Sequence, residues 1–130
     1  MTEKKQQSPS KLLTETELEL MSILWRIFQG SVHEVMECLP NDRNLAYTSV
    51  STILRILEQK KFVRSQKEGR GHIYIPRVSK QEYEGTSLQH LVASVFDGTP
   101  STMVRRLLET SDLSNEELKS IRSLLRERLQ

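Results

Sequence analysis

Apolar residues recur three and four positions apart through much of the chain, which is the spacing of amphipathic helices. In residues 14–28 they are dense enough to predict a helix that is buried on most sides at the centre of a small domain. Thr14 and Glu17, three apart, predict a capping box at its start, and Gly30 predicts its end. The predicted stripe comprises Leu18, Met21, Trp25 and Phe28, widened by Leu20, Ile23, Leu24 and Ile27.

Two further helices follow in the order of a helix-turn-helix. Ser31 and Glu34 predict a second capping box at the start of the shorter helix, which Pro40 closes. The longer helix is predicted over residues 48–60, with Thr48 as its N-cap. Its apolar stripe comprises Val50, Ile53, Leu54 and Leu57. The opposite, polar face comprises Thr48, Ser51, Thr52, Arg55 and Gln59.

A β-hairpin is predicted directly after this helix. Two runs rich in β-forming residues, 62–68 and 72–75, flank a glycine-containing turn, and Pro76 ends the second run. Arg70 is expected at the tip of the hairpin. A helix followed by a basic hairpin is the arrangement of a winged helix-turn-helix, whose helix enters the major groove of DNA.

Residues 79–130 predict three more amphipathic helices. Gly85 is expected to interrupt the first of them, at a cost of about 1 kcal/mol relative to alanine, and to mark a weak point after the winged domain. Pro100 suits the first turn of the second helix. Capping boxes are predicted for the first and third helices at Ser79 with Glu82 and at Ser114 with Glu117.

These three helices carry more apolar surface than so short a segment can bury by itself. A two-fold dimer would bury the stripes against a second copy, whereas the alternative is a monomer in which the helices fold back on the winged domain. The residues expected at the dimer interface are Leu88, Leu91, Val92, Val95, Phe96, Val104, Leu107, Leu108, Leu118, Ile121, Leu124 and Leu125.

Charge is distributed unevenly along the chain. Residues 43–77 hold eight Lys or Arg and two acidic residues, whereas residues 11–42 hold two Lys or Arg and six acidic residues. The net charge of +2 for the whole chain conceals this basic stretch. A local basic patch predicts binding to a polyanion, and hydroxyls with a guanidinium are groups that bond phosphates and base edges. The alternative is an ordinary solvated helix and hairpin.

Composition excludes several classes of protein. No apolar run is long enough to span a membrane, and residues 1–11 lack the apolar core of a secretory signal, so we expect a cytoplasmic protein with a disordered tail over 1–11. Cys38 is the single cysteine, which excludes an internal disulfide and a multi-cysteine metal site. No nucleophile–base motif or phosphate-binding glycine loop is present, so we expect no enzyme, no metal and no cofactor.

From about Leu13 to Leu129 the chain resembles the penicillinase/methicillin-resistance repressor family, BlaI/MecI/CopY. No single segment is decisive, but five occur in order with the right spacing. They are LTETELELMSILW at 13–25, the YTSVSTIL and LEQKKFV parts of 47–63, GRGHIYIPRVSKQEY at 69–83, LVASVFDGTPSTMVRRLLE at 91–109 and LSNEELKSIRSLL at 113–125.

This resemblance implies an N-terminal winged helix-turn-helix, a C-terminal dimerisation element of three helices, and a homodimer that represses transcription from a palindromic operator. By position, Ser49 and Thr52 fall where the family usually has threonine at the start of the recognition helix. The residues that fall on the family's wing are Arg70, His72 and Tyr74.

The chain departs from the family pattern at several positions. Ile56 stands where the family commonly has arginine, and Arg55 precedes it, which turns the guanidinium by about 100° and predicts a different operator preference. Lys61 replaces the glycine that usually follows the recognition helix, so the helix is expected to end differently. The paired C-x-C motifs of the copper-responsive branch are absent, so we do not expect a metal sensor.

The resemblance also bears on how repression is relieved. In the antibiotic-responsive branch, a membrane sensor-peptidase leads to cleavage within the dimerisation helices. The corresponding segment here is residues 104–107, where Arg106 and Leu107 do not match the Asn-Phe pair that is cut in some relatives. Proteolytic relief through such a partner is therefore a hypothesis.

We predict a mainly α fold with a small β-hairpin wing: a tail at 1–11, a winged helix-turn-helix DNA-binding domain at 12–78 and a helical dimerisation domain at 79–130. The predicted function is a homodimeric repressor on a pseudo-palindromic DNA operator, with antibiotic resistance among the processes it could regulate. The alternative is a winged-helix protein-interaction module without sequence-specific DNA binding. Residues expected at the DNA are Arg43, Tyr47, Thr48, Ser49, Ser51, Thr52, Arg55, Lys60, Lys61, Arg64, Lys67, Arg70 and His72.

Overall fold

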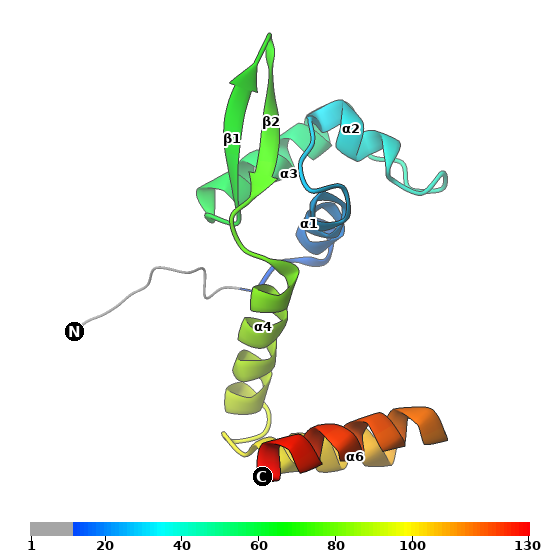
Figure 1. Cartoon of the computed structure of the whole chain (residues 1–130). Coiled ribbons are helices and arrows are strands. Elements are labelled where there is room, and N and C mark those ends of the chain that lie inside the picture. Colours follow the sequence, from blue (N-terminus) through cyan, green and yellow to red (C-terminus); the bar gives the residue numbers. More distant parts are fainter. Residues whose placement is uncertain (1–11) are drawn as a thin grey trace, which may run out of the picture. The chain divides into compact units, whose positions relative to one another are not determined.

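The computed structural model describes residues 12–130, which form six helices and one antiparallel pair of strands (Figure 1). The predicted mainly α fold with a hairpin wing is confirmed. The tail expected over residues 1–11 lies outside the described residues. In chain order the elements are α1 (Glu15–Ile27), α2 (Val32–Glu37), α3 (Tyr47–Gln59), β1 (Val63–Glu68), β2 (Gly71–Pro76), α4 (Lys80–Ser94), α5 (Pro100–Thr110) and α6 (Asn115–Leu129).

The described residues form two compact units, which divide inside α4, between Ser87 and Leu88. The domain boundary expected between residues 78 and 79 lies just before the start of α4. Gly85 does not interrupt this helix, which is continuous from Lys80 to Ser94. None of the helices in residues 12–130 combines the length and the apolar character that a membrane crossing demands.

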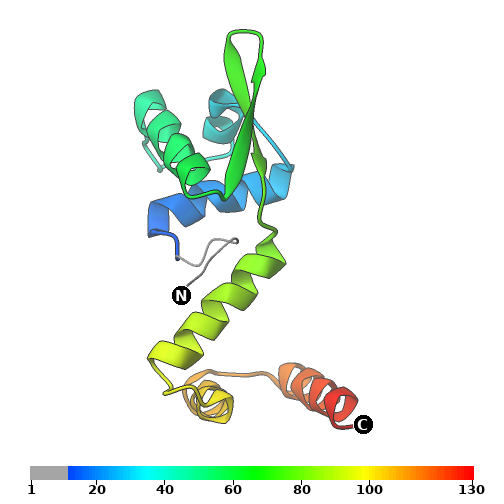
Figure 2. The ribbon, with the colours of Figure 1, turned by 90° about the vertical axis from the view of Figure 1, so that its left-hand side faces the viewer.

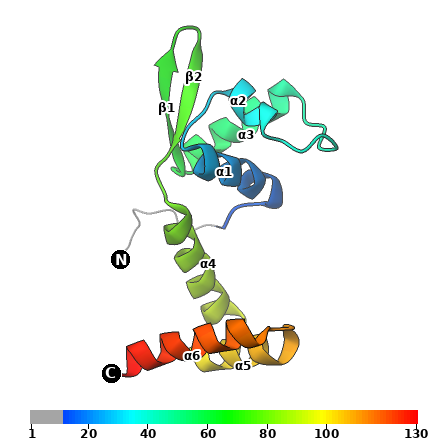
Figure 3. The ribbon, with the colours of Figure 1, turned by 45° about the vertical axis from the view of Figure 1, so that its right-hand side comes forward.

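The core of the first unit is built by α1, α2, α3 and the hairpin (Figure 3). The predicted stripe of α3 is confirmed, because Val50, Leu54 and Leu57 are fully buried and Ile53 packs against them. Helix α1 contacts α2, α3 and β2, so it lies at the centre of this unit, as its dense pattern predicts. The most deeply buried members of this core are Leu20, Met21, Leu24, Val35, Val50, Leu54, Leu57, Phe62 and Val63.

Aromatic contacts hold the first turn of α4 to the same core. The ring of Tyr83 lies 5.8 Å from the rings of both Trp25 and Phe62, and its hydroxyl accepts a hydrogen bond of 2.9 Å from the amide of Leu13. The indole Nε1 of Trp25 donates to the carbonyl of Val78 at 2.8 Å. Trp25 is therefore a core residue, as the sequence predicts.

The end of α1 differs from the prediction. The helix stops at Ile27, and Phe28 is its C-cap with a φ of 77°, so the side chain predicted to continue the stripe is 79% exposed. Gly30 does not terminate the helix but forms an isolated β-bridge with Tyr74 of β2. A Cβ at Gly30 would lie 2.9 Å from Cδ1 of Ile27, so a larger residue here would require the end of the Ile27 side chain to shift.

Both ends of α3 also differ from the prediction. The N-cap is Ala46, which offers no side-chain bond, and Thr48 lies in the first turn. At the other end Lys61 adopts a φ of 70°, the conformation that glycine usually supplies. The amide of Phe62 bonds to the carbonyl of Leu57 at 2.9 Å, and that of Lys61 to Glu58 at 3.0 Å, which is a Schellman motif. The expectation that lysine would end the helix differently is therefore wrong.

Four N-terminal caps were predicted from Ser/Thr with Glu three residues later. Both bonds of the box form at three of them. At α6 the Ser114 hydroxyl accepts from the amide of Glu117, and the described residues show no bond in return. Pro100 occupies the first turn of α5, as predicted. The complete boxes are Thr14 with Glu17, Ser31 with Glu34, and Ser79 with Glu82.

Candidate nucleic-acid interface

Helix α3 presents a hydroxyl-rich face on the side away from the core. Thr48, Ser49, Thr52 and Arg55 are exposed, and Ser51 is half-buried. The ion pairs found among residues 12–130 do not include Arg55, so its guanidinium is available to an outside partner. Because Ala46 gives no side-chain cap, amides of the first turn also keep their hydrogen-bonding capacity, as at other anion-binding helix starts.

The wing rises beside α3 as a two-stranded ribbon (Figure 2). Ser65 pairs with Tyr74, and Lys67 with His72, across the two strands. Because side chains alternate along a strand, these four lie on one face of the wing and Arg64 lies on the other. The tip is the two-residue turn Gly69-Arg70, where Gly69 has a φ of 60°.

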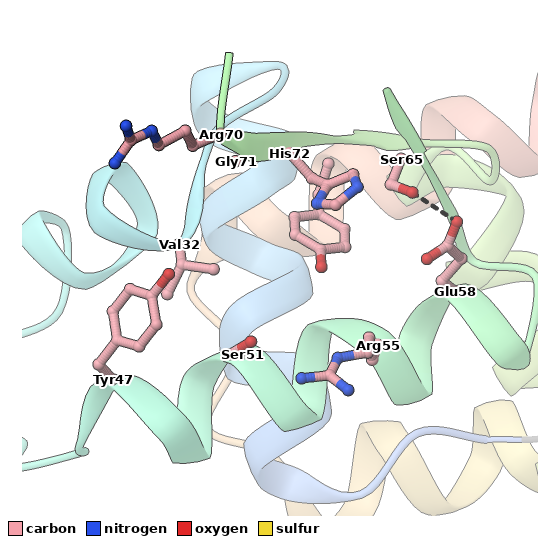
Figure 4. A pocket seen from close by; sticks show the side chains of 10 residues that line it. Val32, Tyr47, Ser51, Arg55, Glu58, Ser65, Arg70, Gly71 and His72 are labelled. Carbon is pink, nitrogen blue, oxygen red and sulfur yellow. Dashed lines mark hydrogen bonds between the residues drawn. The ribbon is translucent and has the colours of Figure 1, made fainter. Parts of the chain in front are cut away.

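A hollow of about 430 Å³ lies between α3 and the wing (Figure 4). We call the end with Tyr47 and Arg70 its outer end, and the end with Glu58 and Ser65 its inner end. Arg55 projects from α3 between the two. The hollow is lined by Val32, Tyr47, Ser51, Arg55, Glu58, Ser65, Arg70, Gly71, His72 and Tyr74.

Hydroxyl groups and the guanidinium of Arg55 line this hollow, and Arg70 lies at its outer end. Tyr74 is 5% exposed, and burial raises the pKa of its phenol, with the charge of Glu58 adding to the rise. The phenol is therefore a neutral hydrogen-bond donor at neutral pH. Neutral donors beside Arg55 and Arg70 make a surface suited to a phosphate backbone.

Two of the predicted phosphate ligands are held by carboxylates of α1. The Nε of Arg43 lies 3.0 Å from Oε1 of Glu19, and the Nζ of Lys60 lies 2.8 Å from Oε1 of Glu17. These pairs connect the turn before α3, and the end of α3, to α1. The remaining predicted phosphate ligands, which are exposed, are Lys61, Arg64, Lys67 and Arg70.

Sequence reasoning missed three residues that belong to this surface. Glu58 accepts a hydrogen bond of 2.7 Å from the hydroxyl of Ser65, which ties α3 to β1. The ring of His33 lies 4.9 Å from that of Tyr47, which it holds at the start of α3. Glu58 could have been found, because it follows Arg55 by three residues and so shares its side of the helix. Ser65 and His33 carry no such local signal.

The second unit keeps much of its apolar surface uncovered. No residue of α5 or α6 is buried, and of the residues predicted for a dimer interface only Val92 is. Arg106, predicted in a possible cleavage segment with Leu107, pairs with Glu109 one turn later in α5. The predicted interface residues that are more than 40% exposed are Leu88, Leu91, Val95, Leu107, Leu108, Leu118, Leu124 and Leu125.

Comparison with known proteins gives concordant results. The family model described as penicillinase repressor matches residues 13–127. The chain is 27% identical over 115 residues to the penicillinase repressor of Bacillus licheniformis, covering 88% of this chain and 90% of that one. It is 22% identical over 113 residues to the methicillin resistance regulatory protein MecI of Mammaliicoccus sciuri, covering 87% and 92%.

A solved structure supports the same assignment. The solution structure of the DNA-binding domain of the repressor BlaI matches with a TM-score of 0.51 and 25% identity. The match covers 61% of this chain and 94% of that one. The winged fold, the arginine-containing hollow between α3 and the wing, and the family match over residues 13–127 all point to the same family. This chain belongs to the penicillinase repressor (BlaI/MecI) family of winged-helix transcriptional regulators.

Proposed function

We propose that this protein is a homodimeric repressor that recognises a pseudo-palindromic operator through α3 and the wing. Membership of a family of DNA-binding transcriptional repressors, rather than of enzymes, is the starting point. The observation that carries the finer proposal is the position of Arg55. It lies on the hydroxyl-bearing side of α3, outside every ion pair of residues 12–130, and lines the hollow under the wing.

The proposed mode of reading follows from these positions. In a winged helix the recognition helix lies in the major groove and the wing contacts the backbone. Arg55 would then bond a base edge, with guanine O6 and N7 the preferred acceptors for a guanidinium. Arg70 would bind phosphate near the outer end of the hollow. The hydroxyls that would bond bases or phosphates beside them belong to Thr48, Ser49, Ser51 and Thr52.

The dimer is proposed from the second unit. Apolar stripes on three helices stay exposed in one chain, and such stripes are usually buried against a partner. A second copy is the simplest partner, because the same stripe on each copy gives a self-complementary, two-fold interface. Two recognition helices would then face successive turns of one side of the duplex and read two half-sites.

Relief of repression by proteolysis is the remaining part of the proposal. A sensor-peptidase would act on the segment that contains Arg106 and Leu107. Because this segment is in the middle of α5, the helix has to open locally before a peptidase can bind an extended chain. Incubation with the activated sensor-peptidase tests this step: fragments cut in α5 support it, and an intact protein released from DNA contradicts it.

Selection from random duplex DNA, with the winning sites titrated at several salt concentrations, tests the main proposal. A two-fold symmetric motif, whose binding falls steeply with salt at a slope of about −0.9 per phosphate contacted, is the expected result. Selected DNA sites that share no sequence motif would contradict operator recognition. Absence of binding even at low salt would favour a protein-interaction module instead.

A further inference from the structure

Glu58 is an acidic residue within a basic surface, and it forms no ion pair among residues 12–130. It accepts one hydrogen bond, from the Ser65 hydroxyl. The other acidic residue of the basic stretch, Glu68, is exposed at the end of β1. A carboxylate that lines the proposed path of a phosphate backbone weakens binding by like-charge repulsion.

The inner end of the hollow would accept a phosphate readily without this charge. Tyr74, which faces Ser65 across the hairpin, supplies a hydroxyl, and Arg55 lies nearby on α3. Neutral donors and a guanidinium are sufficient to hold a phosphate of any sequence. The outer end offers a competing position, with Arg70 and Tyr47. A DNA duplex could therefore bind with its phosphate backbone at either end of the hollow.

Resting on the proposed function, we infer that Glu58 is a specificity-determining residue that excludes phosphates from the inner end of the hollow. A like charge penalises the deeper docking position. The phosphate backbone of the DNA is then confined to the outer end of the hollow. In that position the polar side chains of α3 would reach the base edges. Binding to random sequence, which is almost entirely electrostatic, loses more from this repulsion than operator binding does.

Glu58→Gln tests the inference because it removes the charge while its amide oxygen still accepts from Ser65. The ligands are a duplex selected by the wild-type protein and a scrambled duplex of the same length and composition. For the scrambled duplex we expect affinity to rise by about threefold or more, with a salt slope steeper by up to about 0.9. Affinity for the selected duplex should change by less than about twofold. The ratio of selected-duplex affinity to scrambled-duplex affinity should therefore fall.

Two control variants separate the charge from its alternatives. Ser65→Ala breaks the bond between α3 and β1 but keeps the carboxylate, so it should not raise the affinity for the scrambled duplex. Glu84→Gln makes the same charge change on the exposed side of α4 and should also have no effect. If Ser65→Ala reproduces the gain, the bond rather than the charge is responsible, and the inference is overturned.

The outcomes also distinguish this inference from the proposed function. A wild-type protein that binds its selected duplex, together with a Glu58→Gln variant of unchanged selectivity, overturns the inference alone. A wild-type protein that binds no duplex overturns both. Thermal unfolding of each variant shows that it is folded before its affinity is compared.

Discussion

The Nζ of Lys60, at the end of α3, lies 2.8 Å from Oε1 and 2.9 Å from Oε2 of Glu17, in the first turn of α1. The Glu17 side chain is only 8% exposed. Burial alone would raise the pKa of Glu17, but hydrogen bonds from Lys60 and from the Thr14 backbone outweigh it and hold the pKa below its ordinary value. This pair fixes α3 to α1, so the charge of Lys60 stabilises the fold.

Lys60→Met should therefore lower the free energy of unfolding without changing the salt dependence of DNA binding. The loss should be about 1–3 kcal/mol, because it leaves the mostly buried Glu17 without its cation. Urea unfolding measures the first effect and duplex titrations the second. Lys67→Met, at an exposed position on the wing, is the control. It should make the salt dependence of DNA binding shallower without lowering the free energy of unfolding. A shallower salt slope for the Lys60 variant would place its ammonium at the DNA.

The depressed pKa of Glu17 also predicts a pH dependence. A carboxyl whose pKa is lower in the folded state contributes stability above its unfolded value near 4.5, and that contribution is lost as pH falls through the folded value. Urea midpoints measured from neutral pH down to about pH 3 should show this loss in the wild type. In Lys60→Met burial acts without the hydrogen bonds and the charge of Lys60, so the decline should be smaller or reversed. If stability declines equally with pH in both proteins, the loss comes from carboxyl groups other than Glu17.

Lys61 provides a prediction about local strain. Its φ of 70° costs about 1 kcal/mol for a residue with a Cβ and little for glycine. Lys61→Gly should thus raise the free energy of unfolding by about 0.5–1 kcal/mol in urea unfolding. Lys61→Ala removes the same charge and keeps the strain, so it is the matched control. Equal stability of the two variants would mean that the strain is relieved elsewhere.

Periodicity predicted the elements well because burial against the core decides them. The α3 stripe is an example: each of its positions is set by one local repeat, and all of them reach the core. Helix ends were predicted less well, since one turn of backbone geometry decides them. At Lys61 the burial of Phe62 and Leu57, with the backbone hydrogen bond between them, outweighs the cost of a left-handed lysine, and no local preference of lysine indicates that.

The parts of the candidate site that lie on one face of α3 could be predicted from the sequence. The parts that depend on side-chain pairs between different elements could not. Arg55 and Thr52 follow from the helical repeat alone. The attachment of Arg43 to Glu19 joins residues 24 apart, and nothing in the basic stretch distinguishes this arginine from the exposed ones. Charge counts therefore overstate the number of cations that are available to DNA.

Arg55 and Arg70 should affect DNA binding in different ways. Arg55→Ala should cost about 1–3 kcal/mol on the selected duplex and relax preference at one base position, because a base contact is lost. Arg70→Ala should weaken all duplexes alike and reduce the salt slope by about 0.9, because a phosphate contact is lost. Titration against single-base variants of the selected duplex separates the two. A uniform loss in both variants would contradict the assignment of Arg55 to the groove.

A charge placed on the exposed stripes of the second unit tests the dimer. Leu108 is 46% exposed on α5 and Leu125 is 55% exposed on α6. In a dimer, glutamate at either position would be buried without a partner, which disfavours association. Sedimentation of Leu108→Glu and Leu125→Glu should then show monomers, and affinity for the selected duplex should fall because only one half-site is held at a time. Ser120→Glu, at an exposed polar position of α6, is the control and should stay dimeric. Variants that sediment as dimers would mean that Leu108 and Leu125 lie outside the dimer interface. A wild-type protein that sediments as a monomer would favour the alternative in which the helices cover their stripes within one chain.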